Sequence, residues 1–279
     1  MVVAYQQEND NQIHLCVTEK QYAELSGRSP VSLSDFEVIL ALCSAVLSCP
    51  GLQWNRPIDS LELFAGECSI SSGEFRERRE ALAMDINFGP SNDIMTDAGF
   101  ANTVFQILNT KPAGALWAAP VCSTWVYLSR GSTGRSASKP MGFNTGLTLQ
   151  HNIMVARVCV ILCIAVAKQI WWCLEQPKGS LLEGHILFQK VLAMRHVNVY
   201  RTCCSLGHFG ADSLKPVWIY SSDTRATEFN EFADRSLRPS NPNMVRHYQD
   251  GSGKARVTGG TALKSSQAYP VKLLGPRFI

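Results

Sequence analysis

The sequence lacks acidic side chains over one long stretch. No Asp or Glu lies between Asp97 and Glu175. The whole chain is nearly balanced, with 26 basic and 23 acidic residues and a net charge of +3, so its overall charge indicates no particular partner. The uneven distribution makes this stretch a candidate surface for a polyanion. Its basic residues are Lys111, Arg130, Arg135, Lys139, Arg157 and Lys168.

Other absences argue against several classes of protein. The apolar runs at 38–47 and 158–167 are much shorter than the roughly 20 residues that a membrane span needs. Residues 1–11 are mostly polar, so we expect no secretory signal and no membrane partner. The ten cysteines include no paired CxxC spacing, which disfavours a zinc site and a disulfide scaffold. These features predict an intracellular chain with no resident metal.

The 279 residues, 46% of them hydrophobic, suffice for a sizeable core. Apolar strands alternate with helices from residue 58 onward, which predicts an α/β fold: a mostly parallel sheet with helices on both faces. In such sheets ligands bind at the carboxyl ends of the strands. We predict strands at 58–64, 81–86, 113–119, 170–175, 198–204 and 216–221, and helices at 71–79, 98–109, 147–168 and 182–195.

The composition divides the chain into three segments. Residues 1–57 form an N-terminal extension with a helix at 36–47, residues 58–221 the α/β core, and residues 222–279 an irregular basic segment that closes on the core. Within the core, residues 129–146 are rich in Ser, Gly and Thr, which predicts a mobile loop.

The first predicted strand leads into the sequence Leu-Phe-Ala-Gly-Glu-Cys at 63–68. A glycine here lets a ligand approach the backbone closely, and the N–H groups of the next helix are expected to be free for an anionic group. Asp85 ends the second strand, where a carboxylate can bind ribose hydroxyls. The chain has no GxGxxG sequence, which disfavours a dinucleotide. An ordinary turn and a solvated aspartate explain these residues equally well.

Two further strands end in side chains suited to catalysis. Cys122 follows the third strand, in the sequence Pro-Val-Cys-Ser-Thr-Trp, and a thiolate is a strong nucleophile. Glu175 ends a strand rich in tryptophan, where a carboxyl group is a candidate proton donor or hydrogen-bond anchor. The alternatives are a structural cysteine and a glutamate that caps the turn before Pro177.

The order of these motifs resembles that of the cytosine-5 methyltransferases, which use S-adenosylmethionine. Residues 61–66 resemble the family's cofactor motif, Asp93-Ile94 its adenine-binding pair, 120–125 its Pro-Pro-Cys motif, and 175–177 its Glu-Asn-Pro motif. The resemblance implies a Rossmann-like methyltransferase with a final antiparallel strand. The cofactor site that it implies comprises Phe64, Ala65, Gly66, Cys68, Asp85, Ile86, Asp93, Ile94 and Pro120.

The sequence departs from the family at several positions. Val121 stands in place of a proline, Gln176 in place of an asparagine, and the family's paired arginines are missing, so that Lys215 or Arg201 would substitute for them. About 40 residues separate Ser221 from a tail that resembles the family's last motif, too few for its large target-recognition domain.

The resemblance implies methyl transfer to carbon 5 of a cytosine, in DNA rather than RNA, with a nuclear location if the source is eukaryotic. Cys122 would be the nucleophile and Glu175 the group that bonds the base. The loop at 129–146 would close over a flipped base. An acceptor in RNA or elsewhere, and a non-catalytic binder of cofactor or nucleic acid, remain as alternatives. The predicted phosphate contacts are Arg130, Arg135, Lys139 and Lys215.

Overall fold

The computed structural model describes residues 57–195, 197–238, 245–253, 255–259 and 269–270. Contacts between Cα atoms divide the chain into a unit of residues 1–52 and a unit of residues 53–279. All described residues belong to the second unit. The helix predicted at 36–47 therefore lies outside the described residues.

Six strands form one mixed sheet in the order β2-β1-β3-β4-β6-β5. Neighbours from β2 to β4 pair in parallel, and β6 is antiparallel to both β4 and β5. This confirms the predicted mostly parallel sheet and its antiparallel strand. The strands are β1 (Ile58–Leu63), β2 (Ala81–Met84), β3 (Thr110–Ala118), β4 (Trp171–Pro177), β5 (Tyr200–Ser205) and β6 (Pro216–Ser221).

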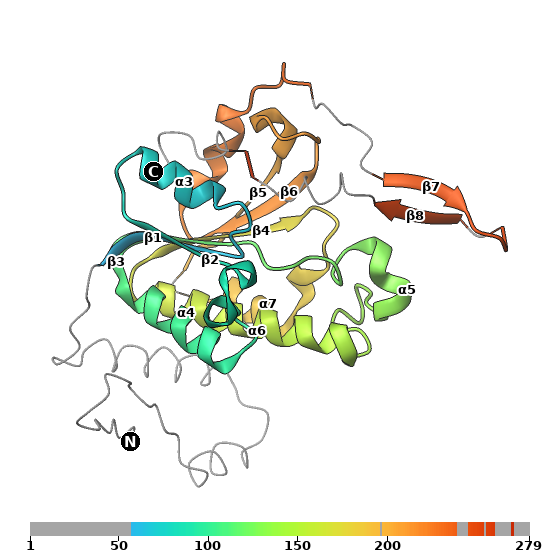
Figure 1. The fold of residues 1–279 in the computed structure, drawn as a ribbon, viewed down its shortest axis with the longest axis horizontal. Coiled ribbons are helices and arrows are strands. Elements are labelled where there is room, and N and C mark those ends of the chain that lie inside the picture. The colour runs from blue at the N-terminus through green and yellow to red at the C-terminus, as the bar shows by residue number, and fades with distance from the viewer. Residues whose placement is uncertain (1–56, 196, 239–244, 254, 260–268, 271–279) are drawn as a thin grey trace, which may run out of the picture. The chain divides into compact units, whose positions relative to one another are not determined.

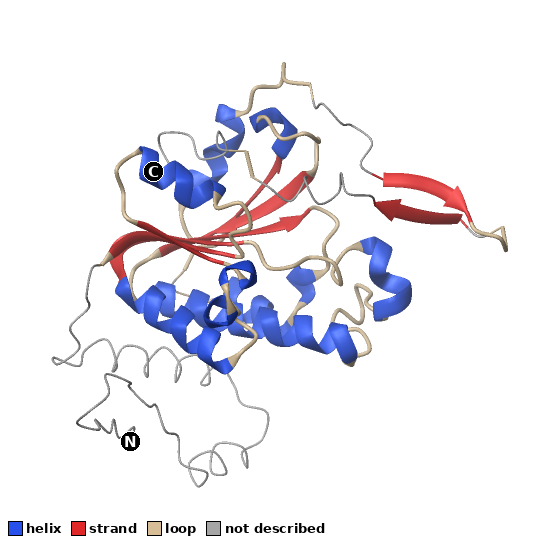
Figure 2. Cartoon of the chain, viewed as in Figure 1, coloured by secondary structure: helices blue, strands red, loops and turns tan. Residues whose placement is uncertain are grey.

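Helices cover both faces of the sheet (Figures 1 and 2). The layer of α4, α6 and α7 covers one face, and α3 lies on the other face. The helix predicted at 182–195 is shorter than expected, because His185 has an extended backbone that separates a 3₁₀ turn from α7. The α-helices are α3 (Ser69–Arg76), α4 (Asp97–Asn109), α5 (Arg130–Thr133), α6 (Gly146–Ala167) and α7 (Ile186–Leu192).

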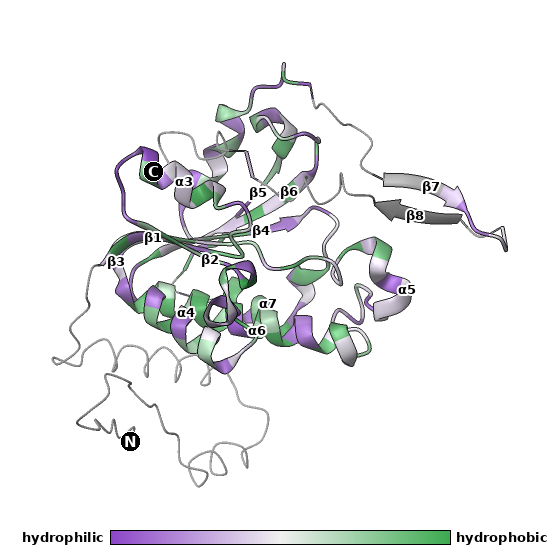
Figure 3. Cartoon of the chain, viewed as in Figure 1, coloured by the Kyte–Doolittle hydropathy of each residue, from purple (hydrophilic) through white to green (hydrophobic). Residues whose placement is uncertain are grey.

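The central strands are buried on both faces, which explains their continuous apolar sequences. On the helical face, Phe188 of α7 packs edge-to-face against Tyr220 of β6, with ring centroids 5.3 Å apart. On the opposite face, Trp117 of β3 packs against Phe229 and Tyr269. Figure 3 shows hydrophobic residues along both the strands and the helical layer.

Helix α6 is long and apolar enough to cross a membrane, by length and composition alone. In this fold it is a core helix, because 61% of its most apolar window is buried inside the protein. Packing of α6 against α4, α7 and β4 therefore explains the apolar run at 158–167.

Two segments are more regular than the sequence suggests. The predicted loop at 129–146 contains α5 and follows a 3₁₀ turn, η3 (Tyr127–Ser129). The predicted irregular segment contains a 3₁₀ helix, η6 (Thr224–Phe232), and an antiparallel ribbon of β7 (Val245–Gln249) and β8 (Ala255–Gly259). The ribbon turns at Asp250, whose Oδ1 accepts a hydrogen bond from the Ser252 amide.

Candidate functional site

A cavity of about 930 Å³ opens at the carboxyl ends of the parallel strands. It lies where the strand order changes direction, since β1 pairs with β2 on one side and β3 on the other. This is the place where α/β sheets bind ligands. The residues of the predicted site that line it are Phe64, Ala65, Gly66, Asp85, Ile86, Asp93, Ile94, Pro120, Cys122, Glu175 and Lys215.

The turn after β1 holds its backbone in an unusual conformation. Phe64, Gly66 and Cys68 all have positive φ angles, of 61°, 51° and 54°. A residue other than glycine in this conformation costs about 1–3 kcal/mol and is often found at a ligand site. Cys68 serves as the N-cap of α3 and does not line the cavity, so its predicted contact with a cofactor is not supported.

Asp85 ties the turns after β1 and β2 together. Its Oδ2 accepts a hydrogen bond from the Gly66 amide at 3.0 Å, and its Oδ1 accepts one from the Asn87 amide at 2.9 Å. Each carboxylate oxygen can accept a second hydrogen bond. Asp85 therefore both positions the turn and retains capacity to bind a ligand.

Glu62 occupies the start of α3 that the sequence suggested was free for a ligand. Its carboxylate accepts hydrogen bonds from the Ile70 amide at 3.3 Å and from the Ser71 amide at 2.8 Å. A buried carboxylate so close to the first turn satisfies these amides internally. The expectation that they bind an anionic ligand group is therefore wrong.

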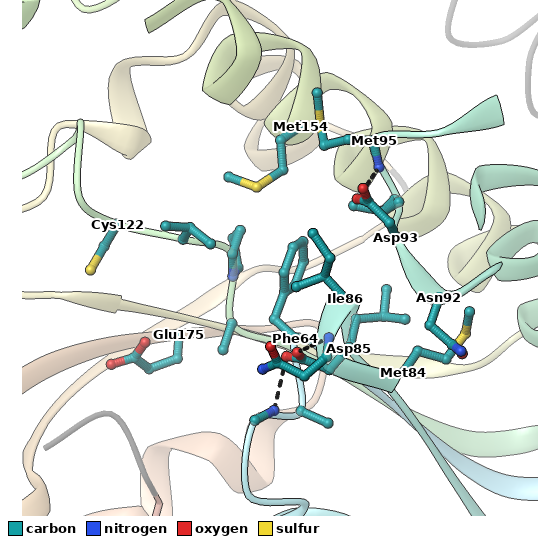
Figure 4. Close-up of a pocket in the computed structure, with 18 of the residues that line it drawn as sticks. Phe64, Met84, Asp85, Ile86, Asn92, Asp93, Met95, Cys122, Met154 and Glu175 are labelled. Carbon is teal, nitrogen blue, oxygen red and sulfur yellow. Dashed lines mark hydrogen bonds between the residues drawn. The ribbon is translucent and has the colours of Figure 1, made fainter. Parts of the chain in front are cut away.

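Asp93 and several apolar side chains line the same cavity as Asp85. The Asp93 Oδ1 accepts a hydrogen bond from the Met95 amide at 2.8 Å, which fixes the carboxylate toward the cavity (Figure 4). Phe64, Ile86 and Met154 provide apolar walls beside it. A flat, partly polar ligand with hydroxyl or amino donors suits this arrangement.

Cys122 and Glu175 lie together at the other end of the cavity. Figure 4 shows the sulfur and the carboxylate pointing to the same side. Burial raises the pKa of the Cys122 thiol, an effect that the positive charge of Lys215 opposes and the charge of Glu175 reinforces. The free protein thus holds this cysteine largely as a neutral thiol near pH 7.

The Cys122 loop is anchored firmly to β4. The Gln176 side chain donates a hydrogen bond to the carbonyl of Pro120 at 2.7 Å, and Ser180 donates one to Gln176 at 2.9 Å. The amide of Leu181 donates to the carbonyl of Trp125 at 2.9 Å. Gln176 therefore positions the Cys122 loop through a hydrogen bond that its amide side chain can donate.

Glu175 is only 4% exposed, and its Oε1 has no hydrogen-bond partner among the described residues. The ammonium group of Lys215 lies 3.5 Å from this oxygen as an ion pair. Tyr269 hydrogen-bonds to the same carboxylate, and burial together with Glu175 raises the pKa of this tyrosine. A buried oxygen without a hydrogen bond is costly unless a ligand donates to it.

The sequence did not indicate the roles of Tyr269 and His151. Tyr269 reaches the cavity from the C-terminal segment, far from Glu175 in sequence, so no local pattern could have identified it. His151 lies inside the apolar α6 and lines the cavity. The sequence signal that could have identified His151 is its place as a histidine within a mostly apolar predicted helix.

Arg135 is not a phosphate contact, because it is only 2% exposed. Its guanidinium group donates hydrogen bonds to the Pro140 carbonyl at 2.6 Å and to Thr124 Oγ1 at 3.2 Å. It also lies 3.3 Å above the ring of Trp125. These contacts with Pro140, Thr124 and Trp125 hold the planar guanidinium group inside the fold. The prediction that Arg135 contacts phosphate is therefore wrong.

A buried hydrogen-bonded chain connects Arg135 to the cavity. Thr124 Oγ1 accepts from Arg135 and lies 2.9 Å from His151 Nδ1. Burial and the charge of Arg135 lower the pKa of His151. Burial lowers the pKa of the neighbouring His185 to about 4. Both imidazoles are therefore neutral near pH 7.

Lys139 is exposed and Arg130 is half-buried, and neither residue lines the cavity. Arg130 stacks on Tyr127, with 4.3 Å between the guanidinium carbon and the ring centroid. Among the described residues, no group of three or more His, Cys, Asp or Glu side chains could hold a metal ion.

The sheet and its ligand cavity define a Rossmann-like α/β fold. No protein-family model and no curated protein sequence matches the chain. The solved structures that are similar to it include three methyltransferases, and the chain covers about half of each of them. The first is a protein encoded within an E. coli prophage and described as a DNA modification methyltransferase, with 13% identity, a TM-score of 0.40, and coverage of 65% of this chain and 52% of that chain.

The second is the Dnmt2 methyltransferase of S. pombe, with 12% identity, a TM-score of 0.40, and coverage of 65% of this chain and 56% of that chain. The third is the methyltransferase EhMeth of Entamoeba histolytica, with 13% identity, a TM-score of 0.35, and coverage of 60% and 53% respectively.

Proposed function

We propose that this chain is an S-adenosylmethionine-dependent methyltransferase that acts on carbon 5 of cytosine in DNA. One observation carries the proposal, which is that a single cavity contains two pairs of side chains. Asp85 and Asp93 lie beside apolar walls in one part, and Cys122 lies beside the buried Glu175 in the other. The first half suits a nucleoside cofactor, and the second half suits covalent activation of a base.

The residues of the cavity fit S-adenosylmethionine. Asp85 retains acceptor capacity for ribose hydroxyls, and Asp93 is placed to accept from an adenine amino group. Phe64, Ile86 and Met154 supply the apolar surface that a purine ring needs. When bound, this cofactor supplies an electrophilic methyl group.

In the proposed mechanism, Cys122 acts as the nucleophile. The thiol releases its proton to solvent, and the sulfur forms a bond to carbon 6 of the base, which breaks the double bond between carbons 5 and 6 and moves its electron pair toward carbon 5. In this step Glu175 carries a proton, and the oxygen that has no hydrogen-bond partner in the free protein donates it in a hydrogen bond to the ring nitrogen, which stabilises the negative charge that develops there.

After carbon 5 gains the methyl group, it loses its proton to solvent. The released electron pair restores the ring double bond and breaks the carbon–sulfur bond, which returns the Cys122 thiolate. Lys215, 3.5 Å from Glu175, supplies positive charge that favours the thiolate at both stages.

Trapping with 5-fluorocytosine tests this mechanism, because fluorine at carbon 5 prevents the final loss of a proton. DNA and RNA oligonucleotides that contain this base are incubated with the protein and S-adenosylmethionine. We expect a denaturation-resistant adduct with DNA, attached to the Cys122 peptide in mass spectrometry. Cys122→Ser should form none, whereas the control Cys203→Ser, which is partly exposed outside the cavity, should form it normally.

Three outcomes would change the proposal. An adduct with RNA alone moves the acceptor to RNA. An adduct on another cysteine overturns the role of Cys122. Cofactor binding without any adduct favours a non-catalytic binder, an alternative that the raised pKa of the Cys122 thiol supports.

A further inference from the structure

Large apolar side chains are exposed on the segment from Val121 to Leu147, which includes Cys122. Tyr127 is 67% exposed and Phe143 is 57% exposed. Val121, Leu128 and Leu147 are also exposed. We call the surface formed by Tyr127, Arg130, Lys139 and Phe143 the aromatic–basic rim.

Each aromatic ring of the rim is paired with a cation. Arg130 lies 4.3 Å from the centroid of Tyr127, and the ammonium of Lys139 lies 5.5 Å from that of Phe143. Arg130 and Lys139 form none of the ion pairs found among the described residues. Their charges are therefore available to a negatively charged partner.

The two pairs are joined through α5 and the turn that follows it. The Phe143 amide donates a hydrogen bond to the Thr133 carbonyl at 2.9 Å. The Phe143 ring lies directly over Gly134, where a Cβ atom would come within 2.5 Å of the ring. Gly134 also has a φ of +65°, so glycine is required for this ring position.

The buried Arg135 supports the rim from below. Its hydrogen bonds to Pro140 and Thr124 connect the segment that carries Lys139 and Phe143 to the Cys122 loop. The rim is thus built in advance on a packed base, which reduces the ordering cost of binding.

We propose that the aromatic–basic rim is a stacking platform for unpaired nucleotides that flank the target base. Exposed rings stack on bases of any sequence, and adjacent cations contact the phosphates of the same strand. The absence of acidic residues between Asp97 and Glu175 removes repulsion along this segment. This inference rests on the proposed function and names its substrate class, a single strand rather than an intact duplex.

Fluorescence anisotropy with labelled 12-nucleotide single strands of DNA and RNA, and with the matched duplex, tests the platform. Tyr127→Leu and Phe143→Leu retain apolar bulk but remove the ring faces. Each should weaken single-strand binding about tenfold, since stacking on one ring contributes roughly 5- to 150-fold. The control is Phe75→Leu on α3, on the other face of the sheet, because Phe75 is equally exposed at 57% and should bind like the parent.

Salt dependence separates stacking from charge. Arg130→Gln and Lys139→Gln should each lower the slope of log affinity against log salt by about 0.7–0.9, while the two leucine variants should leave it unchanged. Unchanged affinity in both leucine variants, equal binding of the duplex, or no binding of any strand by the parent would overturn the platform.

Calorimetry with S-adenosylmethionine and trapping at Cys122, performed on the same variants, test the proposed function separately. If cofactor binds and the adduct forms while the leucine variants bind like the parent, the platform fails and the proposed function stands. Circular dichroism of each variant excludes misfolding as the cause of a loss.

Discussion

At the scale of single residues, the most informative feature is the setting of the Cys122 thiol. Burial raises its pKa, the cation of Lys215 lowers it, and the carboxylate of Glu175 raises it. These opposing charges lie 3.5 Å apart as an ion pair. The pKa of the Cys122 thiol therefore depends on Glu175 of β4 and on Lys215, which directly precedes β6, as well as on burial.

We expect alkylation of Cys122 by iodoacetamide to be slow at pH 7 and to increase through the alkaline range, because only the thiolate reacts. Lys215→Met should shift this increase to higher pH by removing the stabilising cation. Glu175→Gln should shift it to lower pH by removing the opposing charge. Peptide-resolved mass spectrometry measures the rate at Cys122 apart from the other cysteines.

Fast alkylation of Cys122 at pH 7 would contradict this prediction, because it would show that the folded protein already holds the thiolate. A faster rate in Lys215→Met would contradict the assigned direction of its effect.

At the scale of elements, Arg135 determines how the Cys122 loop packs against α6. The segment 129–146 was expected to be mobile and to bind phosphate, yet its central arginine is buried. Burial lowers the pKa of Arg135 to about 10, so it remains charged near pH 7. Carbonyl oxygens, the Thr124 hydroxyl and the Trp125 ring compensate for the desolvated charge.

We expect Arg135→Ala to lower the free energy of unfolding by about 2–4 kcal/mol, since it leaves buried acceptors unpaired and removes the contact with Trp125. Arg135→Lys should also be less stable than the parent, because one ammonium cannot reproduce the planar contacts. Urea unfolding followed by circular dichroism measures both.

Lys139→Ala is the control, because this basic residue of the same segment is exposed, so its removal should change stability by about 0.5 kcal/mol or less. If Arg135→Ala kept full stability but lowered the salt dependence of nucleic-acid binding, the original prediction of a phosphate contact would be restored.

At the scale of the whole molecule, the cavity combines the ends of four strands. Residues after β1, β2 and β3 meet residues of β4 and the distant Tyr269 there. A ligand in this cavity binds only the folded protein, so its binding must stabilise the fold. Cofactor binding is therefore measurable as stability, without any assay of methyl transfer.

We expect S-adenosylmethionine at 100 times its Kd to raise the free energy of unfolding by about 2.7 kcal/mol. Asp85→Ala should weaken binding by about 1.5–3 kcal/mol through loss of charge-assisted hydrogen bonds. The affinity of Asp85→Asn, which keeps one acceptor oxygen, should lie between the affinities of the parent and of Asp85→Ala. Isothermal titration calorimetry gives the affinities, and urea unfolding gives the stabilisation.

Asp97→Ala serves as the control, because the Asp97 side chain is 98% exposed and pairs only with Arg157 among the ion pairs of the described residues. An absence of binding by the parent would overturn the cofactor assignment. If Asp85→Ala and the parent bind S-adenosylmethionine with equal affinity, Asp85 does not contact the cofactor and serves only to hold the Gly66 and Asn87 amides.

Local sequence patterns determined the sheet and the strand-end positions of Gly66, Asp85, Cys122 and Glu175. Apolar runs set which segments are buried strands, and parallel strands bring their carboxyl ends to one edge. The tertiary structure alone decided that Glu62 fills the start of α3, that Arg135 is buried, and that Tyr269 reaches Glu175. The reason is physical: periodicity reports how a segment packs, but the partner of a charged or polar group comes from contacts far away in the chain.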